Sequence, residues 1–250
     1  MKIGIAGAGI GGLAAATLLA QDGHDVTLFD QFDAPRPVGS GLVMQPVGLS
    51  VLDRIGVGDG ARRLGAPLDT MFGHEADTGR VVLSVAYGAT ADRKGLGIHR
   101  AALFSLLLEA SEAAGARLMS SQRVTGRSGQ RLQISGTETA PFDLIIDACG
   151  ASSPLSPLIS RPLPYGAVWA TVPWPEDSAL PMTRLSQCYR RADRMLGVLP
   201  VGAMPDQPWQ NLAAIFYSLP VSGFDQWRQT PFAQWRDEAC ALWPGFAPFL

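Results

Sequence analysis

A glycine-rich turn near the start of the chain, between an apolar run and a helix-like segment, most constrains what this chain can fold into. Residues 3–6 are typical of a short buried strand, and positions 7–12 read Gly-Ala-Gly-Ile-Gly-Gly, which fits G-x-G-x-x-G. Residues 13–21 have helical character, residues 26–29 form a second β-rich run, and Asp30 closes that run. Strand, turn, helix, strand and acid in this order predict a βαβ unit that binds a dinucleotide.

Each position of the turn has its own physical task. Gly7 permits a tight turn, Gly9 lets the backbone approach a pyrophosphate, and Gly12 lets the helix pack closely on the strand. The first helical turn presents unpaired N–H groups and a positive dipole end to the phosphates. Asp30 lies near the offset of roughly 20 residues at which an acid binds a ribose hydroxyl. A turn without a ligand and a solvated carboxylate are the alternative interpretations of these two features.

Composition excludes several other classes of protein. Lys2 before an apolar stretch resembles a signal peptide, but the glycines of the turn would break a continuous apolar helix. The formal net charge is −2 with no basic stripe, so no nucleic-acid partner is expected. No apolar run approaches the roughly 20 residues of a membrane span. Three widely spaced cysteines fit neither a disulfide framework nor a metal site, and they favour a reducing, cytoplasmic location.

After Asp30 the chain departs from the strict strand-helix alternation of an NAD-dependent dehydrogenase. We expect, in order, a helix near residues 47–55, a hairpin over 70–86, a helix over 100–114, a strand from 116, a hairpin over 123–134 and a buried strand at 142–147. The interrupting hairpins make a plain NAD-dependent dehydrogenase the weakest alternative.

The second half begins with a proline-rich segment, which predicts a linker followed by short strands. We expect further strands at residues 186–191, 194–202 and 211–220, and a helix over 224–243. Within that helix Trp227, Trp235 and Trp243 lie about two turns apart, a spacing more typical of core residues than of a stacking surface. Nothing in this half names a substrate or an oligomeric state.

Four segments carry, in order, a resemblance to a known family: GAGIGG with its later acid, RPVGSGL, IHRAALFSLLL and DLIIDACGASS. Residues 2 to about 157 resemble the FAD-binding domain of the flavin-dependent aromatic hydroxylases, the p-hydroxybenzoate hydroxylase-like class A monooxygenases. The resemblance implies an α/β fold: a glutathione-reductase-like, Rossmann-type FAD-binding domain with a parallel sheet and a β-meander, and a substrate domain with a mixed or antiparallel β-sheet. It implies an FAD-binding domain over 1–157 and a substrate domain over 158–250. The hairpin at about 68–90 would join the substrate-domain sheet.

The resemblance also assigns cofactor contacts, residue by residue. The pyrophosphate of FAD would lie against the turn formed by Gly7, Ala8, Gly9, Ile10, Gly11 and Gly12. Asp30, with the adjacent Gln31, would bind the adenosine ribose. Ser40 and Gly41 are expected beside the flavin or its ribityl chain, and Arg100 would contact FAD through its planar guanidinium. Val124 is expected to line the adenine pocket or to be a strand core residue, and His99 to pack rather than to react. The sequence identifies no catalytic residue and no metal ligands.

For the whole protein the resemblance implies a monooxygenase. NADH or NADPH would reduce the bound FAD, and O2 would then give a C4a-hydroperoxyflavin that hydroxylates a small aromatic substrate. A largely apolar, covered pocket is expected around that chemistry. The alternatives are a flavin-dependent reductase, dehydrogenase or halogenase on the same fold, and a nucleotide-binding remnant without turnover.

Two departures from the family pattern bear on these alternatives. The family's usual Gly-Ala-Asp-Gly is replaced by Asp147-Ala148-Cys149-Gly150, which is closer to the pattern of related flavin halogenases and reductases. Cys149 is expected to be a small buried residue at a tight turn rather than a reactive thiol. The family's later Gly-Asp segment, which contacts the ribityl chain, is not found before Leu250. We therefore expect the chain to stop inside the substrate domain, without roughly the last third of the family's length.

Overall fold

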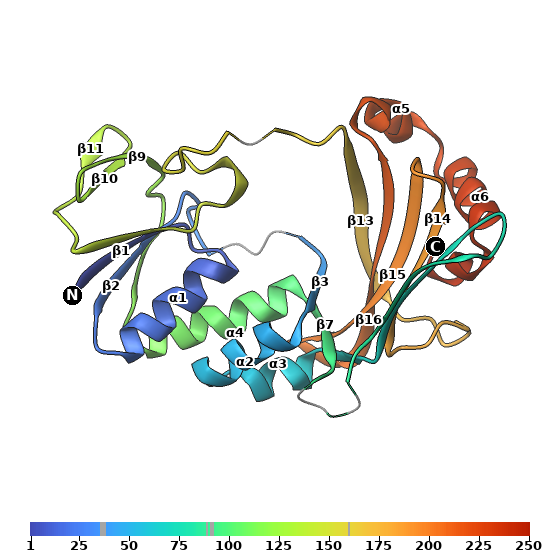
Figure 1. Ribbon diagram of the computed structural model, residues 1–250, viewed down its shortest axis with the longest axis horizontal. Helices are drawn as coiled ribbons and strands as arrows, with labels where there is room; N and C mark the ends of the chain where they lie inside the picture. Colours follow the sequence, from blue (N-terminus) through green and yellow to red (C-terminus); the bar gives the residue numbers. More distant parts are fainter. Residues whose placement is uncertain (36–38, 89, 91–92, 160) are drawn as a thin grey trace. The chain divides into compact units, whose positions relative to one another are not determined.

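The computed structural model describes residues 1–250 except 36–38, 89, 91–92 and 160 (Figure 1). The chain divides into two compact units. The first unit comprises Met1–Val38, Val51–Asp59 and Leu103–Arg161, and the second comprises Gly39–Ser50, Gly60–Ala102 and Pro162–Leu250. The units are interleaved along the sequence, and the functional division at residue 157 stays a prediction.

A four-stranded parallel sheet forms the centre of the first unit. Its strands, in spatial order, are β12 (Leu144–Asp147), β1 (Lys2–Ala6), β2 (Asp25–Phe29) and β8 (Arg117–Met119). Helix α1 (Ile10–Gln21) connects β1 to β2, which are parallel neighbours, as the βαβ prediction requires. Ile3 and Ile5 on β1 and Leu13 on α1 are at most 1% exposed, so helix and sheet share one apolar core.

A small antiparallel sheet, the predicted meander, accompanies this parallel sheet. Its strands are β9 (Val124–Ser128), β10 (Arg131–Ile134) and β11 (Thr137–Glu138). Val124, Leu132 and Ile134 are buried in one cluster with Ala6 and Phe29 from the parallel sheet. The meander is therefore packed on the carboxyl ends of β1 and β2, where the glycine turn begins.

Strand β12 was expected to be buried, and this prediction is wrong. Leu144 is 41% exposed, and Ile145 and Ile146 are only partly buried. The strand lies at the edge of the parallel sheet and pairs with β1 alone in that sheet. An apolar run of residues can form either an edge strand or a central strand, so the residues of β12 could not reveal that it lies at the sheet edge.

A six-stranded sheet dominates the second unit. Its strands, in spatial order, are β13 (Tyr165–Pro173), β16 (Gln207–Pro220), β15 (Arg194–Met204), β14 (Arg184–Arg190), β5 (Thr70–Glu75) and β6 (Val81–Ala86). Only β14 and β5 are parallel, so the sheet is mixed, as predicted. The hairpin β5–β6 joins this sheet through β14, and it turns at Gly79, whose φ is +68°.

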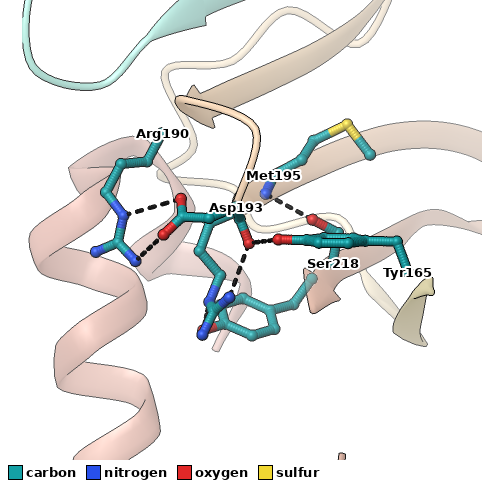
Figure 2. A network of polar contacts seen from close by, with 7 residues as sticks. Tyr165, Arg190, Asp193, Met195 and Ser218 are labelled. Atoms are coloured by element: carbon teal, nitrogen blue, oxygen red, sulfur yellow. Dashed lines mark hydrogen bonds and ion pairs between the residues drawn. The ribbon is translucent and has the colours of Figure 1, made fainter. Parts of the chain in front are cut away.

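The turn between β14 and β15 is fixed by a polar network (Figure 2). The Arg190 guanidinium donates two hydrogen bonds, of 3.3 and 3.1 Å, to the Asp193 carboxylate, and these bonds lower the pKa of that carboxyl. The backbone oxygen of Asp193 accepts from the Tyr165 hydroxyl and, at 2.7 Å, from Arg194. These bonds connect the edge strand β13 to the turn between β14 and β15, on the other side of β16.

The two faces of the six-stranded sheet are covered by different elements. Alternate residues of β16 point to opposite faces: Ala213 and Ile215 to one cluster, Ala214 to another. Helices α5 (Phe224–Gln229) and α6 (Phe232–Leu242), red in Figure 1, cover the first face together with the 3₁₀ segment Pro244–Phe249. The second face contacts a three-stranded antiparallel sheet of β3 (Gly41–Met44), β7 (Gly95–His99) and β4 (Ala66–Leu68).

The single helix predicted over residues 224–243 is in fact two helices, α5 and α6. Pro231 has no N–H to donate and disfavours helical geometry at the preceding residue, and Thr230 accordingly has an extended ψ of 129°. The three tryptophans still pack against one cluster, with Trp243 6% exposed, as the core interpretation expected.

The remaining α-helices in the described part of the chain are α2 (Pro46–Ile55), α3 (Gly58–Leu64) and α4 (Arg100–Ala113). Gly115, at a φ of +90°, follows α4 at the predicted stop. Within the described part of the chain, no helix is long and apolar enough to cross a membrane.

Candidate functional site

The glycine turn after β1 is a position where side chains are excluded by the backbone itself. Gly7 has a φ of +99°, and a Cβ there would lie 2.5 Å from the backbone oxygen of Ala148. A Cβ on Gly12 would lie 2.0 Å from the backbone oxygen of Gly7. Glycine at these two positions therefore lets α1 start directly against the end of β1 and the segment after β12.

Gly9 differs from its neighbours in the turn, because it faces open space. Its backbone is extended, with φ −74°, and an added Cβ would have no described atom within 4 Å. Gly9 is the N-cap of α1, contributes no side chain, and accepts the first helical hydrogen bond from Leu13 at 2.9 Å. The N–H groups of the first helical turn, at Ile10, Gly11 and Gly12, have no intrahelical acceptor, so this end of α1 favours an anion.

Asp30 is attached to this turn by a direct hydrogen bond. Its Oδ2 accepts from the Ala8 N–H at 2.9 Å, and its Oδ1 accepts from the Phe32 N–H at 3.0 Å. The carboxylate thus joins the glycine turn to the end of β2, and each oxygen retains capacity for a further donor. This arrangement suits a hydroxyl donor on a ligand that lies along the turn.

A cavity of about 770 Å³ opens beside these groups, within the first unit. Five residues predicted from the sequence line it: Gly7, Gly9, Asp30, Gln31 and Val124. The other four residues of the predicted turn do not line it: Ala8 is buried under Asp30, and Ile10, Gly11 and Gly12 form the first turn of α1. The volume lies in the range of about 300–1,000 Å³ typical of small-molecule sites.

The larger part of the cavity wall was not among the cofactor contacts that the sequence assigned residue by residue. The additional lining residues are Phe29, Phe32, Arg123, Thr125, Ala148, Cys149, Gly150, Ser152 and Pro154. Arg123 and Thr125 flank Val124 at the start of β9, and the rest of this set belongs to the end of β2 and the loop after β12. The usable signal was their place after parallel strands, since ligands bind beyond the carboxyl ends of such strands.

The Asp147-Ala148-Cys149-Gly150 segment is held by its own acid. Asp147 accepts from the Cys149 N–H at 3.1 Å and from the Ser153 hydroxyl at 2.6 Å. Burial, and then the nearby Asp147 charge, raise the pKa of the Cys149 thiol to about 11. The thiol therefore stays protonated at neutral pH, which makes Cys149 a poor nucleophile.

Ser40, Gly41 and Arg100 are brought together in the second unit. Arg100 N–H donates to the backbone oxygen of Ser40 at 2.7 Å, where β3 and β7 pair. Gly39 has a φ of +112°, and a Cβ there would lie 2.7 Å from Arg100 Nε. Arg100 Nε is buried and has no hydrogen-bond partner among the described residues. Among the described residues, the second unit thus presents a buried donor without an acceptor, beside Gly39.

Comparison with known proteins decides the family. Residues 1–137 match the model of the FAD binding domain family. The chain belongs to this family. The match covers more than half of the chain, including the glycine turn, Asp30 and Arg100.

Curated relatives of this FAD-binding chain include aromatic hydroxylases, which confirms the predicted resemblance. A 6-hydroxynicotinate 3-monooxygenase of Pseudomonas fluorescens is 30% identical over 190 residues, covering 71% of this chain and 49% of that protein. A 3-hydroxybenzoate 6-hydroxylase of Aquipseudomonas alcaligenes is 34% identical over 116 residues, covering 44% of this chain and 29% of that protein. The chain spans about half the length of the first of these relatives.

Among solved structures, 2-methyl-3-hydroxypyridine-5-carboxylic acid oxygenase shares the fold. The TM-score is 0.76 at 18% identity, covering 99% of this chain and 66% of that protein. The predicted α/β fold with a parallel sheet and a mixed sheet is confirmed.

The residues of the first unit fit a dinucleotide on their own geometry. The open space at Gly9 admits a pyrophosphate to backbone distance, and the end of α1 offers it N–H groups. Asp30 offers carboxylate oxygens for ribose hydroxyls, and the cavity beyond it, between the ends of β2 and β9, has room for a base. In the second unit, Arg100 Nε, which has no hydrogen-bond partner in the described part of the chain, provides a separate donor for an acidic or carbonyl oxygen.

Proposed function

We propose that this chain binds FAD and belongs to a flavin-dependent monooxygenase that hydroxylates a small aromatic substrate with NADH or NADPH and O2. The observation that carries the proposal is the cavity at the carboxyl ends of β1 and β2, where the open Gly9, the end of α1 and Asp30 converge. FAD, when bound, accepts a hydride from the nicotinamide and activates O2 for transfer to the ring.

The residues of this chain would bind and orient that cofactor. Gly9 and the first turn of α1 would hold the pyrophosphate, Asp30 with Gln31 the adenosine ribose, and Val124 the adenine. Ser40, Gly41 and Arg100 would contact the flavin end. No side chain in the turn is placed to act as a base, and this fits a chemistry that the cofactor performs.

The names of the relatives support a substrate class. They act on 6-hydroxynicotinate and 3-hydroxybenzoate, and the fold neighbour on 2-methyl-3-hydroxypyridine-5-carboxylic acid. These three molecules are aromatic rings that carry both a hydroxyl and a carboxyl group. We propose a hydroxylated aromatic or pyridine carboxylate as the substrate of this protein too. A cytoplasmic location is part of the proposal, because Cys149, Cys188 and Cys240 are free thiols.

Oxygen consumption tests the proposal. The full chain, loaded with FAD and given NADH or NADPH, is assayed against hydroxybenzoates and hydroxypyridine carboxylates. The proposal expects O2 uptake that depends on one of these compounds and a product heavier by one oxygen atom. NAD(P)H oxidation that no aromatic compound accelerates would reject the hydroxylase.

A second candidate is a flavin-dependent reductase, dehydrogenase or halogenase, favoured by the Asp147-Ala148-Cys149-Gly150 segment. The acid of this segment stands two places before the family's usual position, and Asp147 accepts hydrogen bonds from Cys149 and Ser153 of its own loop. Product analysis under O2, with and without chloride or bromide, separates these activities. A chain that binds FAD but is neither reduced nor reoxidised would instead be a nucleotide-binding remnant.

A further inference from the structure

Three polar side chains of the second unit form a continuous chain of hydrogen bonds. Ser40 Oγ lies 2.6 Å from Thr171 Oγ1, and Thr171 Oγ1 lies 3.2 Å from His99 Nε2. Ser40 precedes β3, His99 ends β7, and Thr171 lies on β13, so these bonds connect the three-stranded sheet to the six-stranded sheet. Ser40 is 6% exposed, and a hydroxyl so far from water needs protein or ligand partners.

The backbone of α4 fixes the direction in which the hydrogen bond between His99 and Thr171 is donated. The Ala101 N–H donates to His99 Nδ1 at 3.2 Å, so Nδ1 is an acceptor and carries no proton. Neutral His99 then holds its proton on Nε2 and donates it to Thr171 Oγ1. Burial lowers the pKa of His99, which favours this neutral form. His99 is therefore a donor to Thr171, and its one basic nitrogen is already occupied.

The hydroxyls of Ser40 and Thr171 have fewer acceptors than protons. Either hydroxyl can donate in the bond between Ser40 Oγ and Thr171 Oγ1, and the described residues offer no acceptor to the proton that remains. The backbone oxygen of Ser40 accepts from the Arg100 N–H, and the buried Arg100 Nε has no hydrogen-bond partner among the described residues. Two donors of one cluster thus have no acceptor in the described part of the chain, which is the pattern that a bound acceptor molecule would complete.

We propose that His99 and Thr171 are positioning residues that hold Ser40 as a hydrogen-bond donor to an acceptor atom of the bound flavin nucleotide. The inference rests on the proposed function, because it takes FAD as the occupant beside Ser40. No proton is transferred along these hydrogen bonds. His99 orients Thr171, Thr171 orients Ser40, and Ser40 meets the ligand with its hydroxyl proton already directed outward.

FAD affinity in a set of substituted chains tests this arrangement. The dissociation constant is measured by quenching of flavin fluorescence for the wild type, Ser40→Ala, Thr171→Val, Thr171→Ser and the double variant Ser40→Ala/Thr171→Val. Thr171→Val keeps the shape of the side chain and removes the hydroxyl, whereas Thr171→Ser restores the hydroxyl. We expect Ser40→Ala and Thr171→Val each to weaken binding about three- to tenfold, the scale of one hydrogen bond. Thr171→Ser should bind like the wild type.

The double variant distinguishes positioning from independent structural damage. If Thr171 acts only through Ser40, the double variant binds FAD no more weakly than Ser40→Ala alone. Additive losses, or wild-type affinity in Thr171→Val, would overturn the inference while FAD binding by the wild type still supports the proposed function. A wild type that binds no FAD would refute the proposed function and this inference with it.

A second measurement needs no ligand and no substitution. The nitrogen-15 NMR spectrum of the three histidines reports which ring nitrogen of each carries the proton. The inference expects His99 to be neutral with its proton on Nε2. A proton on Nδ1 would make His99 Nε2 an acceptor from Thr171 rather than a donor to it, and would contradict the donor role of Ser40.

Discussion

Gly9→Ala should weaken FAD binding strongly without disturbing the fold. An added Cβ at this position meets no described atom within 4 Å, and the backbone already has a negative φ of −74° that alanine adopts. The unfolding free energy of the FAD-free chain should therefore stay within about 0.5 kcal/mol of the wild type. The Cβ instead projects into the space that a pyrophosphate needs.

The size of the binding loss follows from contact distances. Backbone N–H groups hold phosphate oxygens at about 2.9 Å, whereas ordinary contacts of a Cβ lie at 3.4–4 Å. The added methyl therefore holds the pyrophosphate about 0.5 Å or more too far away for one such bond. Hydrogen bonds to a charged group contribute about 1.5–3 kcal/mol each, so the dissociation constant should rise roughly 10- to 150-fold.

Two neighbouring glycines provide matched controls for this prediction. Gly11 also has no described atom within 4 Å of an added Cβ but does not line the cavity, and alanine keeps the N–H that this turn offers to the pyrophosphate. Gly11→Ala should therefore fold and bind FAD nearly as the wild type does. Gly12→Ala places a Cβ 2.0 Å from the Gly7 oxygen and should cost about 1–3 kcal/mol of stability. Fluorescence titration and urea unfolding measure both quantities. Gly9→Ala with wild-type affinity would refute the placement of the pyrophosphate.

Three further results are expected. Asp30→Ala leaves the N–H groups of Ala8 and Phe32 without their acceptor. The variant should lose about 1–3 kcal/mol of unfolding free energy in urea and at least about tenfold in FAD affinity. Replacement of the exposed Asp33 by alanine is the control, and equal effects in both variants would contradict the role of Asp30. Burial, and then the nearby Asp77 charge, raise the pKa of the Cys188 thiol from 9.0 to about 11. Because this pKa lies above the unfolded value, the stability that the thiol contributes is complete below pH 9 and is lost as the pH rises to 11. Between about pH 8 and about pH 10.5, the unfolding free energy in urea should fall less for Cys188→Ala than for the wild type, and an equal fall in both would count against this. Phe246 is 1% exposed and stacked on Trp243, so Phe246→Ala should lower the unfolding free energy by about 3–5 kcal/mol. A loss below about 1 kcal/mol in urea unfolding would show that this cluster is not a packed core.

The sequence predicted the first unit well because its signals are local. The positive φ of Gly7, the close approach at Gly12 and the acid after β2 are demands of one short βαβ unit, and each leaves a residue that can be read in isolation. The hairpin over residues 123–134 and the helix that begins at Arg100 were found for the same reason, since periodicity and turn residues mark them.

The parts that the sequence did not predict depend on partners far away in the chain. The exposure of Leu144 follows from the position of β12 at the sheet edge, which is set by the order of strands rather than by its own residues. Thr171 carried no signal, because its role depends on Ser40, 131 positions away, and on His99. Arg123 and Thr125 line the cavity only because the meander is packed at the end of β2. Pro231 was visible in the sequence but was outweighed by the tryptophan spacing on both sides of it.

Competition between FAD and its two halves tests the central claim most directly. Calorimetric titrations with FAD, ADP and FMN would be compared for the wild type and for Gly9→Ala. Because the turn and Asp30 line a cavity that fits a pyrophosphate, a ribose and a base, ADP alone should bind the wild type and compete with FAD. Gly9→Ala should bind both FAD and ADP more weakly, by similar factors. FAD binding that FMN displaces and ADP does not would contradict the assignment of this cavity to the adenosine diphosphate half of the cofactor.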